Sequence, residues 1–345
     1  MRTILAAIAV TAVAITFAPG CADPDPADAP QAASGPADLR IDLAMRSPAS
    51  ASYEAVIADV TIVNTSDHPV RLLSWFLPAT ELQEPVFTIT RSGQPVAFIG
   101  PHYKRAPAAA TDFVVLAPGA RLASQVELSR FYDFSQTGDY TVQVAIESTT
   151  LRAQPGLLTS QASTVWVERR LAVTEKPVRD TCTASEKALI ATAITSAGQI
   201  ATGARDYLSG SPAATPRYTT WFGTFSNGGW ATARSHFTAL ADAFATQPIQ
   251  VDCKCGQKNV YAYVYPDQPY KIFVCGAFWQ APMTGTDSKA GTLVHEMSHF
   301  NVVAATDDWA YGQTACRSLA LSDPARALDN ADSHEYFAEN TPAQP

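Results

Sequence analysis

Residues 288–300 read Ser-Lys-Ala-Gly-Thr-Leu-Val-His-Glu-Met-Ser-His-Phe, and this stretch decides the fold of the second half of the chain. Its apolar residues give a helical context to a His-Glu-x-x-His pentapeptide. Positions i and i+4 of a helix share one face, so His295 and His299 can reach one Zn²⁺, with Glu296 beside them to deprotonate a metal-bound water. The motif predicts a zinc hydrolase; a capped surface helix is the alternative.

The third protein ligand of such a metal is not fixed by the pentapeptide. A metzincin would continue with glycine and histidine where Val302 and Ala305 stand, so that class is excluded. A thermolysin-like enzyme would use a later glutamate, but the later glutamates lie far along the chain. The remaining nearby candidates are Asp307 and Asp308.

Composition limits the number of domains and the partners. With 345 residues, of which 47% are hydrophobic, two domains are the natural expectation. The formal net charge of −8 would repel a phosphate backbone, so nucleic acid is excluded as a partner.

The first residues predict export. Residues 1–21 combine one early positive charge, an apolar run over 4–17 and small residues that follow. Cys21 resembles the acylated cysteine of a bacterial lipobox, while cleavage near Ala22 is the alternative. The mature chain is therefore expected to be secreted, or lipid-anchored at the bacterial cell surface.

The chain is expected to be multidomain. Residues 22–38 are rich in Ala, Pro and Asp and predict a disordered linker. Short alternating segments recur over 39–168 and predict an N-terminal all-β sandwich. They are 56–62, 85–90, 125–128, 140–146 and 164–168. A charged, proline-bearing linker is expected over 169–181.

Residues 182–345 predict a mainly α domain with a small sheet, an α+β arrangement. Thr183 and Glu186 form a capping box that opens a helix to about residue 208, and a second helix is expected over 229–246. Strand-like runs at 249–251, 260–265 and 272–274 predict the sheet, and helices resume near residue 288.

The pentapeptide is followed by Thr306-x-Asp308 and Ala310-Tyr311-Gly312, and this arrangement resembles the deuterolysin-like metalloendopeptidases, the aspzincins. The similarity is greatest to their peptidyl-Lys branch and spans 182–345. Other segments that carry it are Thr-Thr-Trp-Phe-Gly at 219–223, Tyr-Val-Tyr-Pro at 263–266, Cys-Gly-Ala-Phe-Trp at 275–279 and Asn-Ala-Asp-Ser-His-Glu-Tyr-Phe at 330–337. One departure is Ala305, which stands where the family usually has glycine.

The resemblance implies a zincin-like catalytic domain with one zinc ion. Its implied ligands are His295, His299 and Asp308, with Glu296 as general base and Tyr311 as the donor that stabilises the oxyanion. Asp307 is then interpreted as a solvated loop carboxylate.

The resemblance also implies a specificity pocket. Asp332 and Glu335 match an acidic pair that binds a lysine on the C-terminal side of the cleaved bond, with arginine as the weaker substrate. The alternative is a terminal helix with an exposed acidic face. His334 is expected to be structural, and His68, His102 and His236 to be ordinary surface or core residues.

Two disulfides are implied by the same resemblance, and they fit an exported chain. One pairs Cys182 with Cys253 and the other pairs Cys255 with Cys275. Cys316 is then the odd thiol, expected to be buried.

A β domain before the catalytic domain resembles the propeptide of bacterial aspzincins. It implies a zymogen whose N-terminal domain acts as chaperone and inhibitor. Self-cleavage before Lys176 and cleavage by another protease at Arg169-Arg170 are alternative activation steps.

Three functions therefore remain open. The first is a secreted zinc endopeptidase that cuts lysine-containing proteins or peptides before lysine. The others are a zinc amidase acting on cell-wall peptides and a surface-anchored binding protein with a non-catalytic zinc domain.

Overall fold

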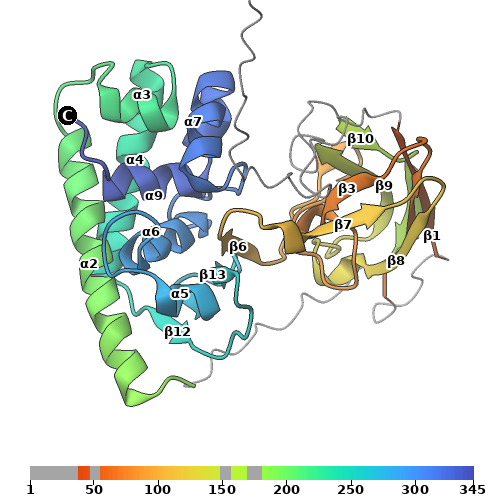
Figure 1. The fold of residues 1–345 in the computed structure, drawn as a ribbon, viewed down its shortest axis with the longest axis horizontal. Coiled ribbons are helices and arrows are strands. Elements are labelled where there is room, and N and C mark those ends of the chain that lie inside the picture. The colour runs from red at the N-terminus through yellow and green to blue at the C-terminus, as the bar shows by residue number, and fades with distance from the viewer. Residues whose placement is uncertain (1–37, 47–54, 148–156, 169–180) are drawn as a thin grey trace, which may run out of the picture. The chain divides into compact units, whose positions relative to one another are not determined.

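The computed structural model of the protein describes residues 38–46, 55–147, 157–168 and 181–345 (Figure 1). These residues contain sheets and helices, so the fold is mixed α and β. Within them, no helix is both long and apolar enough to cross a membrane. Cys21, Ala22, Arg169-Arg170 and Lys176 lie outside the described residues, as do the export signal and most of the two predicted linkers.

The strands predicted over residues 39–168 are present. The alternation of apolar and polar side chains places Val60, Phe87 and Val142 in one common core. Strands of this region are β1 (Leu39–Met45), β2 (Ile57–Asn64), β3 (Val70–Leu73), β4 (Phe87–Arg91), β5 (Gln94–Pro95), β6 (His102–Arg105), β7 (Phe113–Leu116), β8 (Arg121–Glu127), β9 (Gly138–Glu147), β10 (Leu157–Thr159) and β11 (Ser163–Val167). Short 3₁₀ turns lie at Ser74–Phe76, Ala110–Asp112 and Leu128–Arg130.

Three sheets surround this core. The first has the order β1-β2-β8, the second β10-β9-β4-β5 with β11 paired to β9, and the third is the pair β3-β7. Strand β6 belongs to none of them. It is instead the edge strand of a sheet formed by residues of the second half of the chain, in the order β12-β14-β13-β6.

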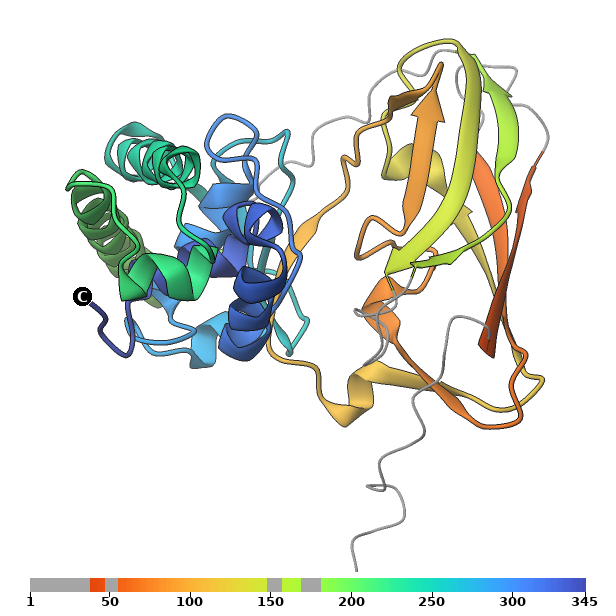
Figure 2. The ribbon, with the colours of Figure 1, turned by 90° about the horizontal axis from the view of Figure 1, so that it is seen from above.

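The partners of β6 are β12 (Gln250–Asp252), β13 (Val260–Val264) and β14 (Lys271–Val274). Strand β6 runs antiparallel to β13, with Tyr103 opposite Tyr263 and Lys104 opposite Ala262. Figure 1 labels β6 next to β13, and Figure 2 shows the same orange and teal segments side by side from above. The predicted small sheet therefore exists, but it gains a fourth strand from the N-terminal half, which the sequence did not indicate.

Helices enclose the second core. They are α2 (Ala184–Leu208), α3 (Pro216–Phe222), α4 (Asn227–Thr246), α5 (Gly276–Gln280), α6 (Lys289–His299), α7 (Gly312–Ser322), α8 (Pro324–Leu328) and α9 (Ala331–Glu339). The capping box of α2 forms as predicted, because the Glu186 carboxylate accepts from the Thr183 backbone N–H at 2.7 Å. Buried alanines on one face of α2, such as Ala197 and Ala201, let α4 and α6 pack closely against it.

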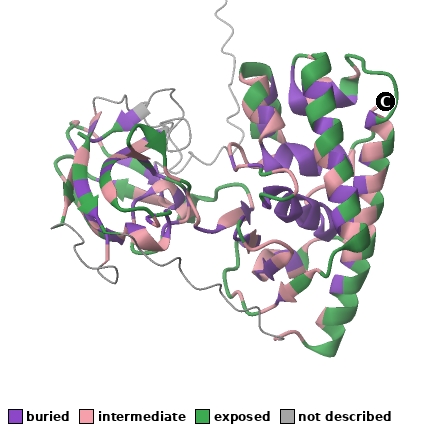
Figure 3. Ribbon diagram, turned by 180° about the vertical axis from the view of Figure 1, so that it is seen from behind, coloured by how far each residue is buried: buried purple, intermediate pink, exposed green. Residues whose placement is uncertain are grey.

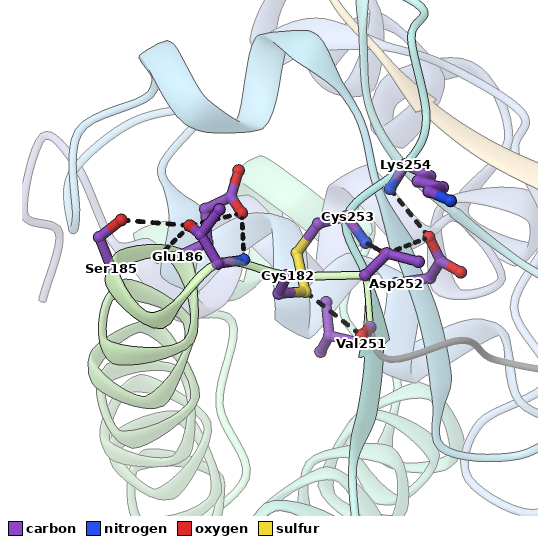
Figure 4. The surroundings of a disulfide bond; sticks show 9 residues. Cys182, Ser185, Glu186, Val251, Asp252, Cys253 and Lys254 are labelled. Carbon is purple, nitrogen blue, oxygen red and sulfur yellow. Dashed lines mark hydrogen bonds between the residues drawn. A yellow bond between two sulfur atoms is a disulfide. The ribbon is translucent and has the colours of Figure 1, made fainter.

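Both disulfides implied by the resemblance are present. Cys182 pairs with Cys253, which ties the start of α2 to the end of β12 (Figure 4). Cys255 pairs with Cys275 and closes the segment that holds β13 and β14. Cys316 is a buried free thiol among the described residues.

Gly223 explains one of the family-like segments. It ends α3 with φ 78°, and a Cβ there would collide with the backbone carbonyl of Ala320 in α7. We expect Gly223→Ala to lower the free energy of unfolding by about 2–4 kcal/mol, because strain and overlap add. The change in the free energy of unfolding is measured by denaturant-induced unfolding of the variant and of the unsubstituted protein.

Gly203→Ala is the matched control. Gly203 lies in α2, where an added Cβ would point into open space, so alanine there should raise the free energy of unfolding by about 0.5–1 kcal/mol. Equal effects of the two substitutions would contradict this account of Gly223.

Candidate metal centre and substrate pocket

Helix α6 carries the His-Glu-x-x-His pentapeptide through the interior. Its N-cap is Ser288, whose hydroxyl accepts from the Gly291 backbone N–H at 2.9 Å. Every residue of the helix is buried (Figure 3). The helical spacing brings Nε2 of His295 and Nε2 of His299 to 3.1 Å from one another.

Asp308 lies in the segment that follows α6, and its carboxylate approaches both His295 and His299. That segment turns at Ala305, whose φ of 52° is the left-handed conformation that glycine adopts most easily. Thr306 then anchors the segment to α6, since its backbone N–H donates to the Ser298 carbonyl at 3.1 Å. The Asp308 carboxylate oxygens lie 3.4 Å from each histidine Nε2.

The donor atoms fit a zinc ion. Zinc bonds of about 2.0–2.1 Å to tetrahedral ligands separate the ligand atoms by roughly 3.3 Å, close to the spacing observed here. Neither carboxylate oxygen of Asp308 has a hydrogen-bond partner among the described residues, which leaves both free for a metal. Burial lowers the pKa of His295 to about 4 and that of His299 well below its usual range, so both imidazoles are neutral and offer a lone pair.

The contacts of the Nδ1 atoms determine which ring nitrogen of each histidine carries the proton and which is free to bind a metal. Nδ1 of His299 lies 2.7 Å from the Thr306 carbonyl oxygen, which can only accept, so Nδ1 carries the proton. Nδ1 of His295 lies 2.8 Å from an Asp332 carboxylate oxygen. Such outer contacts orient metal-binding histidines and raise their basicity.

Glu296 and Tyr311 lie near the candidate ligands, and both contact the N-terminal half of the chain. One Glu296 oxygen accepts from the Lys104 backbone N–H at 3.3 Å, and the other has no partner among the described residues. The Tyr311 hydroxyl donates to Glu84 at 3.0 Å, and its ring packs edge-on against Trp75.

Asp307 and His102 form a separate contact. Their side chains approach to 3.5 Å, and an Asp307 oxygen accepts from the Asp308 backbone N–H at 2.8 Å. His102 also packs on His299, with ring centroids 4.8 Å apart. The expectation of an ordinary position for His102 was wrong, because β6 places it against a candidate ligand.

His334 is a buried residue whose Nε2 lies 2.9 Å from Nδ1 of His236.

Asp332 and Glu335 form a buried pocket that is filled by a lysine of the same chain. One turn of α9 separates them, and both are fully buried, so the alternative of an exposed acidic face was wrong. The ammonium of Lys104 enters from β6 and lies 2.6 Å from Glu335 and 3.2 Å from Asp332. Burial alone would lower the pKa of Lys104, but the carboxylates outweigh it and raise that pKa well above its usual range.

The pocket contains groups that the sequence did not indicate. Asp287 lies 3.5 Å from the Lys104 ammonium, whose nitrogen is 5.2 Å from the ring centre of Tyr261 and 5.6 Å from that of Tyr336. The sequence contained one indication that Lys104 could occupy this site, because Lys104 is the only lysine before Lys176. Among residues 1–175, only Lys104 could therefore place a lysine side chain between these carboxylates.

Several known proteins are similar to this chain. Residues 207–339 match the family model described as lysine-specific metallo-endopeptidase. An extracellular protease of Aeromonas hydrophila is 42% identical over 85% of this chain and 90% of its own length. Peptidyl-Lys metalloendopeptidases of Grifola frondosa and Armillaria mellea are 38% and 34% identical, over 82% and 99% of this chain and 88% and 98% of their own lengths.

The similarity to the Aeromonas hydrophila protein covers nearly the whole length of both chains, at a level of identity that establishes common family membership. The family model covers the helix with the pentapeptide, Asp308, and the acidic pair in α9. The chain therefore belongs to the aspzincin family, and it is a zinc metalloendopeptidase.

Proposed function

We propose that this enzyme hydrolyses peptide bonds on the N-terminal side of lysine in proteins or peptides. The contact of the Lys104 ammonium with Asp332 and Glu335 carries this proposal, because it presents a lysine bound as a substrate side chain would be. The names of the fungal relatives point to the same specificity. The name of the bacterial relative supports secretion, which we propose for this chain too.

His295, His299 and Asp308 are the proposed zinc ligands. A bound zinc ion supplies an activated water and polarises the carbonyl of the cleaved bond. Glu296 acts as the general base, and it then protonates the leaving nitrogen. Its oxygen lies 3.3 Å from the Lys104 backbone nitrogen, which is the leaving atom when a chain is cut before lysine. Tyr311 is the proposed donor to the developing oxyanion.

Residues 39–168 are the proposed β-sandwich inhibitor domain, and residues 182–345 the catalytic domain. The inhibitor domain would block the site until the two domains are separated. Cleavage in the 169–181 linker, followed by removal of the inhibitor domain, would open it.

Two contacts support inhibition. Lys104 fills the proposed lysine pocket, and Glu84 accepts a hydrogen bond from the Tyr311 hydroxyl, the proposed oxyanion donor. Burial raises the pKa of Glu84 to about 8, and the guanidinium of Arg105, 3.6 Å away, opposes that rise. The proposed oxyanion donor and the lysine pocket are therefore both occupied by the N-terminal half.

Glu296→Gln tests the proposed general base. The amide cannot accept the proton, so kcat on an X–Lys peptide should fall at least 10³-fold. Zinc content should not change, since Glu296 is not a proposed ligand. The measurement is peptide hydrolysis by the matured enzyme, with zinc determined by atomic absorption. Full activity of the variant would contradict the assignment.

Removal of the metal is the second test. A chelator should abolish hydrolysis, and added zinc should restore it, because three protein ligands leave a position open for water. Chelator-resistant hydrolysis would contradict a zinc mechanism. A protein that binds zinc but cuts no peptide would favour the binding function, and release of cell-wall peptides alone would favour the amidase.

Glu335→Gln tests the lysine pocket. Loss of one buried carboxylate should raise KM for X–Lys peptides about 10- to 100-fold, because charge-assisted hydrogen bonds contribute about 1.5–3 kcal/mol. Cut sites in a mixed peptide library, read by mass spectrometry, measure the preference. Unchanged selectivity for lysine over other residues would remove Glu335 from the pocket.

Lys104→Ala tests inhibition in the unprocessed chain. The variant should cleave an added X–Lys peptide at least tenfold faster than the unsubstituted unprocessed chain, because the pocket is then open. Arg121→Ala, an exposed change in β8, is the matched control and should leave the unprocessed chain inactive. A Lys104→Ala chain that stays inactive until it is processed would contradict inhibition by Lys104.

A further inference from the structure

We propose that Asp287 is a third specificity-determining carboxylate of the lysine pocket. This inference rests on the lysine specificity proposed above and extends it to a residue outside the acidic pair of α9. Asp287 comes directly before Ser288, the N-cap of α6, so the pocket is built from α9 and from the segment that leads into α6.

Two hydrogen bonds to α9 hold Asp287 in its conformation. Its φ of 51° is left-handed, a conformation that costs free energy for a non-glycine residue but that Asp adopts more readily than most. Its backbone N–H donates to Glu339 at 3.2 Å, and the Tyr336 hydroxyl donates to its carboxylate at 2.6 Å. Both partners lie on α9, the helix that carries Asp332 and Glu335, so the three carboxylates are fixed relative to one another.

The three carboxylates around the Lys104 nitrogen equal in number the three N–H donors of an ammonium group. A lysine ammonium has three N–H donors, and the pocket surrounds the Lys104 nitrogen with carboxylates at 2.6, 3.2 and 3.5 Å. A planar guanidinium directs its donors in one plane and fits such a site poorly. Asp287 is the only one of the three with solvent access, since its side chain is 32% exposed while the other two are fully buried.

These positions give Asp287 a distinct role. The buried pair binds the ammonium at the base of the pocket, and Asp287 adds negative charge at the side that solvent reaches. It therefore contributes to the attraction of a lysine side chain and to its retention. Its hydrogen bonds and ion pair join it to α9 and to Lys104 rather than to the proposed zinc ligands.

Asp287→Asn is the decisive substitution. Asparagine tolerates left-handed backbone and can still accept from the Tyr336 hydroxyl, so only the charge is lost. For an X–Lys peptide we expect the matured variant to show an about tenfold higher KM, equivalent to about 1.4 kcal/mol, with kcat changed less than twofold. Selectivity for lysine over arginine should fall by a similar factor.

Asp242→Asn, an exposed change on α4, is the matched control and should leave both constants unchanged. A variant with unchanged KM and unchanged selectivity, beside an unsubstituted enzyme that cuts X–Lys bonds, would overturn the role of Asp287 alone. An unsubstituted enzyme without lysine preference would instead overturn the proposed function. A drop in kcat at constant KM would assign Asp287 a structural effect on the metal site and would also overturn the inference.

Discussion

A buried ion pair joins the N-terminal half of this chain, through Lys104, to Asp332 and Glu335 of the second half. The ammonium of Lys104 is fully buried, and an unpaired charge in that position would cost several kcal/mol. Asp332 and Glu335 compensate it, and they are themselves buried in the full chain, so loss of either partner there would leave the other charge buried and unpaired. This mutual requirement helps to fix β6 against β13. It thereby places His102 against His299 and the Lys104 backbone against Glu296, at the candidate metal centre.

Asp332 connects the proposed lysine pocket to the candidate metal centre. The same carboxylate oxygen lies 2.8 Å from Nδ1 of His295 and 3.2 Å from the Lys104 ammonium, and the other oxygen accepts from the Gly312 backbone N–H at 2.7 Å. Burial alone would raise the pKa of Asp332, but Lys104 and His295 outweigh it, and the pKa lies below its usual range. The Lys104 ammonium and the proposed metal ligand His295 are thus oriented by one ionised group.

The sequence predicted those parts of the fold that depend on local chemistry. The capping box at Thr183, the alternation around Val60 and Val142, and the spacing of His295 and His299 each depend on neighbours within a few residues, and the structure has the corresponding helix, strands and facing imidazoles. The assigned roles of Asp308, Asp332 and Glu335 came from family resemblance. They stay proposals, supported by their burial and their positions around α6. Long-range pairing was beyond sequence reasoning, because no short-range pattern specifies that β6 pairs with β13 rather than with another strand of the N-terminal half. Asp287 was missed because its left-handed turn before α6 carries no distinctive residue type, whereas Lys104 was identifiable in principle as the only lysine available to that region.

The reactivity of Lys104 toward an amine-modifying reagent tests the central claim most directly. The measurement uses the full chain with Glu296→Gln, so that no self-cleavage intervenes, and mass spectrometry quantifies the modification of each lysine. The buried ion pair predicts that Lys104 reacts at least 100-fold more slowly than Lys258, which is exposed, and that Glu335→Gln in the same chain speeds its reaction. Equal rates at Lys104 and Lys258 in the folded chain would contradict the account.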